Sequence, residues 1–231
     1  METVDYLKAN YDYWKQGYEA ENVESQVFRV YGRIFKAQFG IDGSKGEKLL
    51  DFGCGAGAAL DFFHRKGFDV YGVDISPIDI ERCQARMPDL TDHFAIIDPT
   101  PTAADVFFGG SYDVVVAIQS LFYFTDTGLK ARLQSLYNQM NKGALFYATM
   151  IGTKASWHHK NGVPLGDGLW KVDFRSPRIE VKDYFENFTT DEKHLMEKFS
   201  LFKKVHVGYY AFRYREDEGD EFFYTYVGVK D

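Results

Sequence analysis

The sequence has few cysteines and no long apolar run. Among its 231 residues only Cys54 and Cys83 are cysteines, which excludes a disulfide framework and the paired cysteine spacing of a zinc site. No run of about 18 apolar residues occurs, so no membrane-spanning helix is expected. The N-terminus carries Glu2 and Asp5 and no apolar segment, so no secretory signal is expected. These absences predict a soluble cytoplasmic protein without a metal site.

The sequence also has fewer basic than acidic residues. The chain has 27 Lys and Arg residues against 34 Asp and Glu residues, and its formal net charge is −7. Proteins that bind polyanions are usually basic, so nucleic acid is not expected as a partner. A hydrophobic content of 45% allows a full core and excludes disorder as the main state. Aromatic residues reach 17%, which suits both a core and a pocket for a planar or methylated ligand.

From residue 48 onward, short apolar segments alternate with helical ones. Strands are predicted at residues 48–52, 69–73, 93–97, 112–118 and 144–150. Helices are predicted at residues 58–66, 77–86, 128–140 and 190–200, and a strand pair at 203–211 and 222–229. This alternation predicts an α/β domain with a parallel sheet covered on both faces.

Two segments stand outside this alternation. Residues 1–40 are predicted to be helical, with aromatic residues at Tyr11, Tyr13 and Trp14 and an apolar stripe that starts at Val27. We expect this helical region to end at Gly40. Residues 152–188 are rich in glycine and include two prolines and two tryptophans. They predict a long excursion between a strand and a helix, and loops of this length are uncommon unless they are functional.

The glycine-rich turn after the first predicted strand is the most informative segment. Alternate glycines let a ligand approach the backbone closely and place N–H groups at a helix N-terminus; here they are Gly53, Gly55 and Gly57. The turn also fits the dinucleotide pattern G-x-G-x-x-G/A, with Asp74 about 20 residues further on. However, the carboxylate of Asp51 would repel a pyrophosphate and would suit an ammonium group. A nicotinamide-dependent oxidoreductase therefore stays open only as an alternative.

The segment Asp51-x-Gly53-x-Gly55-x-Gly57 resembles the first motif of the class I S-adenosylmethionine-dependent methyltransferases. Asp74 and Asp98 match the acidic positions after the second and third strands of that family, and residues 112–116 with 121–123 resemble its fourth-strand motif. The resemblance covers residues 45–150, and it departs from the family at 141–143, where a common proline is missing. It implies a Rossmann-like, doubly wound, seven-stranded, mostly parallel sheet with the last strand antiparallel.

The resemblance also implies S-adenosylmethionine as the cofactor and assigns roles around it. The three motif glycines would let the loop pass under the methionyl part, and Asp51 would meet its ammonium. Asp74 would accept hydrogen bonds from both ribose hydroxyls. Ile75 would pack on the adenine ring, and Asp98 would accept a hydrogen bond from the adenine amino group. Gln119 would line the methionine end.

An N-terminal helical lid often closes the site in this family. We therefore divide the chain into a lid at residues 1–44 and a methyltransferase domain at residues 45–231, in which residues 152–188 form a substrate cap. Within the lid, Tyr11 and Arg33, or Arg29 in place of Arg33, are the candidates for contact with the methionyl group. The aromatic residues of the lid could equally belong to the core, and the arginine to a solvated helix face.

The acceptor is expected to lie with the lid and the excursion. The excursion is locally basic, which favours an anionic or carbohydrate-like acceptor but also fits a solvated loop. A hydroxyl acceptor needs a base, and His158 or His159 could serve because histidine titrates near neutral pH. We predict methyl transfer to an oxygen or nitrogen atom of a small-molecule acceptor, by a monomer or homodimer. A protein that binds S-adenosylmethionine without turnover remains the non-enzyme alternative.

Overall fold

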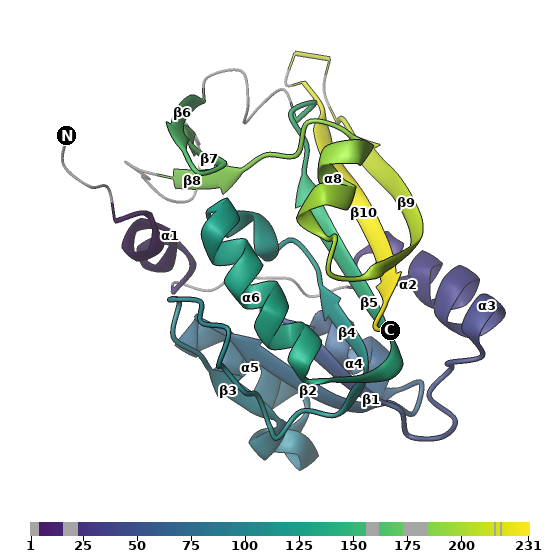
Figure 1. Cartoon of the computed structure of the whole chain (residues 1–231). Coiled ribbons are helices and arrows are strands. Elements are labelled where there is room, and N and C mark those ends of the chain that lie inside the picture. Colours follow the sequence, from purple (N-terminus) through teal and green to yellow (C-terminus); the bar gives the residue numbers. More distant parts are fainter. Residues whose placement is uncertain (1–4, 16–22, 156–161, 173–183, 215, 218) are drawn as a thin grey trace.

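A seven-stranded sheet runs through the centre of the molecule in the order β3-β2-β1-β4-β5-β10-β9 (Figure 1). The computed structural model describes residues 5–15, 23–155, 162–172, 184–214, 216–217 and 219–231. The strands are β1 (Lys48–Phe52), β2 (Asp69–Asp74), β3 (Phe94–Ile96), β4 (Tyr112–Ala117), β5 (Met140–Ile151), β9 (Lys203–Phe212) and β10 (Glu221–Val229). The last strand, β10, pairs antiparallel with both β5 and β9, and the other strand pairs are parallel, which confirms the predicted mostly parallel sheet.

Helices cover both faces of this sheet. One face packs against α4 (Ala58–His64), α5 (Pro77–Arg86) and a helical segment made of α2 (Ser25–Val30), the π-helix η1 (Tyr31–Lys36) and α3 (Ala37–Phe39). The other face packs against α6 (Asp126–Asn138) and α8 (Glu192–Lys198). Neighbouring strand residues point to opposite faces, so Leu49 packs with the first group and Leu50 with the second, and both are fully buried. Burial on both faces explains why these strands read as continuous apolar runs.

The N-terminal helical region agrees in part with the sequence. The helix α1 (Tyr6–Trp14) begins at Asp5, whose side chain accepts a hydrogen bond from the Lys8 N–H. The second helical stretch ends at Gly40, which has a left-handed φ of 68° as a helix stop requires. Its middle turn is a π-helix, which the sequence did not predict. Residues 16–22, between the two stretches, lie outside the described residues.

The excursion at residues 152–188 contains a second sheet. Its antiparallel strands are β6 (Val163–Gly166), β7 (Leu169–Val172) and β8 (Tyr184–Asn187). The sequence did not predict these strands because each is four residues long and the segment is rich in glycine and proline. Another correction concerns the helix predicted to end at residue 140. It ends at Asn138 as α6, and β5 already begins at Met140, which pairs with Tyr112.

The helix α1 is attached to this second sheet. The Asn10 side chain donates a hydrogen bond to the Phe185 carbonyl (3.0 Å) and accepts one from the Phe185 N–H (3.1 Å). The side-chain amide of Asn10 therefore makes the same pair of hydrogen bonds with the β8 backbone that a residue of a neighbouring strand would make. Figure 1 shows α1 and the second sheet at the same end of the molecule. Segments from opposite ends of the chain are thereby held together beside the main sheet.

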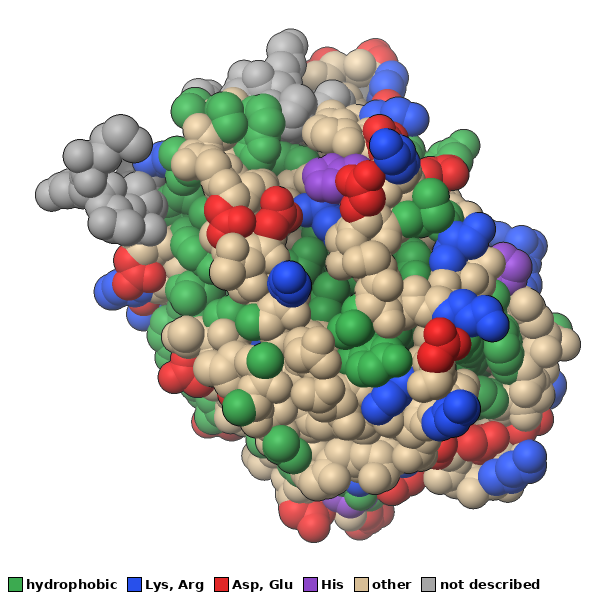
Figure 2. All heavy atoms as spheres, viewed as in Figure 1, with side chains coloured by type: hydrophobic (Ala, Val, Ile, Leu, Met, Phe, Trp, Pro, Cys, Tyr) green, Lys and Arg blue, Asp and Glu red, His purple; other side chains and the backbone are tan. Residues whose placement is uncertain are grey.

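The surface over α6 and α8 carries charges of both signs. Figure 2 shows lysine, arginine, aspartate and glutamate side chains interspersed on this face. Two short 3₁₀ segments, η2 (Pro88–His93) and η3 (Leu121–Tyr123), complete the fold. No helix within the described ranges is long and apolar enough to cross a bilayer.

Candidate functional site

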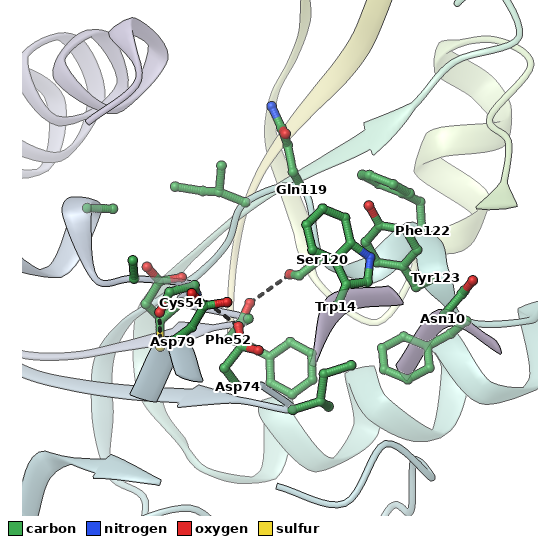
Figure 3. Close-up of a pocket in the computed structure, with 18 of the residues that line it drawn as sticks. Asn10, Trp14, Phe52, Cys54, Asp74, Asp79, Gln119, Ser120, Phe122 and Tyr123 are labelled. Atoms are coloured by element: carbon green, nitrogen blue, oxygen red, sulfur yellow. Dashed lines mark hydrogen bonds between the residues drawn. The ribbon is translucent and has the colours of Figure 1, made fainter. Parts of the chain in front are cut away.

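A cavity of about 360 Å³ lies at the carboxyl ends of β1, β2 and β4. Open α/β sheets bind ligands at this edge, where loops from neighbouring strands meet. One half of the cavity is formed by the glycine-rich loop and the ends of these strands. The other half is formed by α1, η3 and β8, together with Phe223 of β10. Figure 3 shows Trp14 of α1 beside Tyr123 of η3 in this half. The site therefore joins the predicted cofactor motif to the lid and the excursion.

Asp51 lies near the end of β1 and is 2% exposed. Its Oδ1 is buried and has no hydrogen-bond partner among the described residues. Burial raises the pKa of this carboxyl to about 8, and the negative charge of Asp74 adds to the shift. A buried acceptor without a partner costs free energy, so a ligand donor at this point would be stabilising. The ammonium group that the sequence predicted here would both donate to Oδ1 and favour the ionised carboxylate.

The three motif glycines differ in what surrounds them. All have positive φ: Gly53 76°, Gly55 51° and Gly57 78°. A Cβ at Gly53 would lie 2.3 Å from the Ser120 Cβ, and one at Gly57 would lie 2.8 Å from the Cys83 Sγ. A Cβ at Gly55 would have no atom within 4 Å, and Gly55 lines the cavity. Gly53 and Gly57 thus permit close packing within the protein, whereas Gly55 leaves open space for a ligand.

Asp74 ends β2 and holds the glycine loop. Its carboxylate accepts hydrogen bonds from the N–H groups of Gly55 (2.8 Å) and Ser76 (2.9 Å). Burial raises the pKa of Asp74 to about 6, although these hydrogen bonds act against the shift. The Ile75 N–H also acts on this carboxylate. The two oxygens have four lone pairs between them, so acceptor capacity remains for a ribose hydroxyl of a nucleoside.

The adenine positions expected from the sequence lie next to Asp74 along the cavity. Ile75 and Asp98 both line it, and Asp98 is exposed at its rim. A hydrogen bond from the Thr100 N–H (2.7 Å) lowers the pKa of Asp98. Asp98 is therefore an ionised acceptor at the edge of the site.

Gln119 follows β4 and has a φ of 53°, which is unusual for a residue with a side chain. Its N–H donates to the Thr149 Oγ1 (2.8 Å), and its side-chain amide donates to Glu24 (3.1 Å) and to the Tyr210 hydroxyl (3.2 Å). These bonds hold a strained backbone at the edge of the cavity, as functional sites often do. Gln119 also lines the cavity. The sequence did not predict that Glu24 holds the side chain of Gln119.

The structure does not bring every predicted residue to the site. Arg33 is exposed on η1 and does not line the cavity. Tyr11 lies on α1, but its ring faces the Lys15 ammonium at 5.8 Å rather than the cavity. The α1 residues that do line it are Leu7, Asn10, Tyr13 and Trp14. Their spacing of three, six and seven residues from the first defines one helix face, which is the signal that would have found them. His158 and His159 lie outside the described residues.

The half of the cavity away from the glycine loop is aromatic. We call the four residues Tyr13, Trp14, Tyr123 and Tyr184 the aromatic chamber; all four line the cavity. The hydroxyls of Tyr123 and Tyr184 share a hydrogen bond of 2.7 Å. Burial raises the pKa of both phenols well above the usual value, so both stay protonated. In the part of the chain that the structure describes, no group of three His, Cys, Asp or Glu residues is arranged to hold a metal ion.

Two curated proteins match part of this sequence. An uncharacterized methyltransferase of Synechocystis sp. is 25% identical over 130 residues, which are 56% of this chain and 59% of that protein. The ubiquinone biosynthesis O-methyltransferase of Pectobacterium atrosepticum is 28% identical over 119 residues, 50% of this chain and 48% of that enzyme. The chain thus matches only about half the length of these relatives.

A solved structure shows the same fold along nearly the whole chain. The magnesium protoporphyrin IX methyltransferase of Synechocystis PCC 6803 with bound SAH superposes with a TM-score of 0.61 at 17% identity, and the match covers 98% of this chain and 96% of that one. A family model described as a methyltransferase domain matches residues 23–186, more than half of the sequence. The chain therefore belongs to the methyltransferase-domain family, among the class I S-adenosylmethionine-dependent methyltransferases.

Proposed function

We propose that this protein binds S-adenosylmethionine and transfers its methyl group to an oxygen or nitrogen atom of a small-molecule acceptor. The observation that carries the proposal is the single cavity that connects Asp51, Gly55 and Asp74 to the aromatic chamber. One half of the cavity suits the cofactor, and the other half is closed by elements from the two ends of the chain. At about 360 Å³ the cavity is near the lower end of the range for ligand pockets, which supports a small acceptor.

The residues present fit the cofactor. The buried Oδ1 of Asp51 would accept from the methionyl ammonium, and Asp74 would accept from the ribose hydroxyls. Ile75 and Asp98 line the cavity and would contact the adenine ring. When bound, the cofactor supplies a methyl group on a positively charged sulfur, which is already activated for transfer. The protein then has to align the acceptor with that methyl group and keep water away.

The lid and the cap that the sequence predicted are proposed to act through α1 and the second sheet. The α1 residues close one side of the cavity, and Tyr184 and Glu186 of β8 close another. We propose that this pair of elements recognises the acceptor. Four of the six basic residues that favoured an anionic acceptor lie outside the described residues: Lys160, Arg175, Arg178 and Lys182. The anionic or carbohydrate-like acceptor therefore stays a prediction.

The role of a histidine base is also a proposal. The Pectobacterium relative is named an O-methyltransferase, which supports a hydroxyl acceptor, and a hydroxyl needs a base. Under this reading His158→Ala or His159→Ala lowers turnover of a hydroxyl acceptor by a factor of about 10² to 10⁴. Unchanged turnover in both variants and in the double variant would remove the histidines from the mechanism.

Calorimetric titration with S-adenosylmethionine, S-adenosylhomocysteine and NAD tests the proposal. We expect micromolar binding of the first two and none of NAD. Binding of NAD alone would overturn the reading of Asp51 and favour the oxidoreductase alternative. Incubation with labelled S-adenosylmethionine and a panel of metabolites then separates an enzyme from a protein that binds the cofactor without turnover, since only an enzyme yields a labelled product.

A further inference from the structure

A buried arginine packs against the wall of the cavity. Arg132 lies in α6 and is 1% exposed. Its guanidinium carbon is 4.9 Å from the ring centroid of Phe52, 5.4 Å from that of Phe107 and 5.8 Å from that of Phe124. Phe52 and Phe124 also line the cavity. Burial of a charge costs free energy, so an apolar side chain would fill this position at lower cost unless the charge is used.

The charge of Arg132 is paired with a loop residue. One guanidinium N–H donates to the Asp105 Oδ2 at 2.7 Å. Asp105 belongs to the loop of residues 97–111, which connects β3 to β4 and contributes Asp98 to the lining of the cavity. The Asp105 carboxylate also accepts hydrogen bonds from the N–H (3.1 Å) and the hydroxyl (2.6 Å) of Thr102. These bonds connect α6 to the part of the loop that lies near Asp98 in the sequence.

The segment between Asp98 and Thr102 is stiff. Pro99 and Pro101 fix two of its φ angles and restrict the residue before each of them. The Asp98 carboxylate also accepts a hydrogen bond from the Thr100 N–H at 2.7 Å. Holding Thr102 therefore limits the positions that the Asp98 carboxylate can take.

The charge of Arg132 also acts on Asp98 directly. The hydrogen bonds from Thr100 and the positive charge of Arg132 both lower the pKa of Asp98. The Asp98 carboxylate is then ionised at neutral pH, and an ionised carboxylate only accepts hydrogen bonds. An acceptor that is fixed in position and in protonation state distinguishes a ligand that donates at that point from one that does not.

The backbone of the loop is held on α6 by other side chains. The Ser135 hydroxyl and the Gln139 amide donate to the Asp105 carbonyl at 2.8 Å and 3.0 Å. The Gln139 amide oxygen accepts from the Phe107 N–H at 2.5 Å. These bonds do not involve Arg132, so replacing Arg132 should release the Asp105 carboxylate while the loop backbone stays attached.

We propose that Arg132 is a positioning residue for the cofactor site: through Asp105 it holds the segment that carries Asp98, and the site thereby selects adenine over a base that lacks the amino group. This inference rests on the proposed function and concerns the specificity of the same site. Arg132 is not among the described residues that line the cavity, so its effect passes through Asp105 and Thr102.

Two ligands that differ at the amino group test the inference. S-inosylhomocysteine is S-adenosylhomocysteine with the adenine amino group replaced by a carbonyl oxygen, so it carries an acceptor where the other carries a donor. Each is titrated by calorimetry into the full chain. We expect the wild type to bind S-adenosylhomocysteine at least about tenfold more tightly than S-inosylhomocysteine. Equal affinities in the wild type would overturn the inference.

Variants of α6 identify the group responsible. Arg132→Met should reduce this preference to less than about threefold, because methionine fills the space among the rings but does not bind Asp105. Arg132→Lys should keep it above about fivefold, since one N–H is enough for the bond to Asp105. Lys130→Met removes an exposed positive charge from the same helix and should leave the preference unchanged. An equal loss of affinity for both ligands in Arg132→Met would mean that Arg132 only supports the fold, and would overturn the inference.

If Arg132→Met does not fold, Thr102→Val gives the decisive measurement. Thr102 is exposed, and valine keeps the shape of its side chain while removing the hydroxyl that binds Asp105. The preference for S-adenosylhomocysteine should fall at least about threefold in this variant. An unchanged preference would overturn the inference.

The wild-type titration separates this inference from the proposed function. If S-adenosylhomocysteine does not bind, the proposed function fails, and the inference fails with it. If it binds and the preference does not depend on Arg132, the inference alone fails, while the cofactor half of the proposed function stands.

Discussion

Replacing Asp51 by asparagine should stabilise the free protein and remove part of its pH dependence. The pKa of Asp51 is raised from 3.8 to about 8 in the folded protein because the carboxyl is buried. Between these two values the folded state holds a proton that the unfolded state has released. The free energy of unfolding therefore falls as the pH rises through this window. Asparagine has nearly the same shape and does not ionise, so the Asp51→Asn variant lacks this loss.

The size of the effect follows from the shift. One proton bound in the folded state and absent from the unfolded state gives a slope of about 1.4 kcal/mol per pH unit. Relative to wild type, the gain of Asp51→Asn should be about 1 kcal/mol near pH 4.5 and about 3 kcal/mol near pH 6. It should level off at roughly 6 kcal/mol above pH 8. The same proton must leave when an ammonium ligand binds, so wild-type affinity for S-adenosylhomocysteine should rise from pH 6 to pH 8.

Urea unfolding of both proteins at pH 5, 6, 7 and 8 measures this difference. The Asp98→Asn variant is the control, because Asp98 lines the same cavity but is exposed and has a lowered pKa. Its difference from wild type should not change over this pH range. A difference between wild type and Asp51→Asn that stays constant with pH would refute the reasoning, since Asp51 would then ionise alike in the folded and unfolded states.

Three further outcomes are expected. Asp74→Asn should weaken the binding of S-adenosylhomocysteine about ten- to a hundredfold, as measured by calorimetry, because charge-assisted hydrogen bonds contribute about 1.5–3 kcal/mol each. Unchanged affinity would contradict the assignment of Asp74 to the site. Gly53→Ala should lower the thermal midpoint of unfolding much more than Gly55→Ala, because a Cβ at position 55 meets no protein atom. Gly55→Ala should still weaken cofactor binding. An equal loss of stability in the two variants would argue against the different roles assigned to the two glycines. Asn10→Ala removes two hydrogen bonds to Phe185, so it should lower the free energy of unfolding by about 1–3 kcal/mol and speed amide hydrogen exchange in β8. Unchanged exchange in β8 would mean that these two bonds do not hold α1 on the second sheet.

The central sheet was predictable because its signals are local. The predicted first strand at residues 48–52 matches β1 to the residue, and the last strand is antiparallel as expected. A strand of Val and Leu that is buried on both faces produces a continuous apolar run, which is readable without knowing its neighbours. The strands of the second sheet produce no such run. The burial of β8 depends on its position beside α1, and no local pattern records that position.

The sequence by itself determined which residues meet in the half of the cavity that we propose for the cofactor. Asp51 and the motif glycines are contiguous, and Asp74 and Asp98 each follow a strand of a parallel sheet, so their meeting at one edge is a consequence of the strand order. Only the tertiary structure decided the half that we propose for the acceptor. Tyr13, Tyr123 and Glu186 are more than sixty positions apart in sequence, yet they line one cavity, beside which Asn10 joins α1 to β8. Contacts of this kind depend on packing between distant elements, and a pattern along the chain carries no record of that packing.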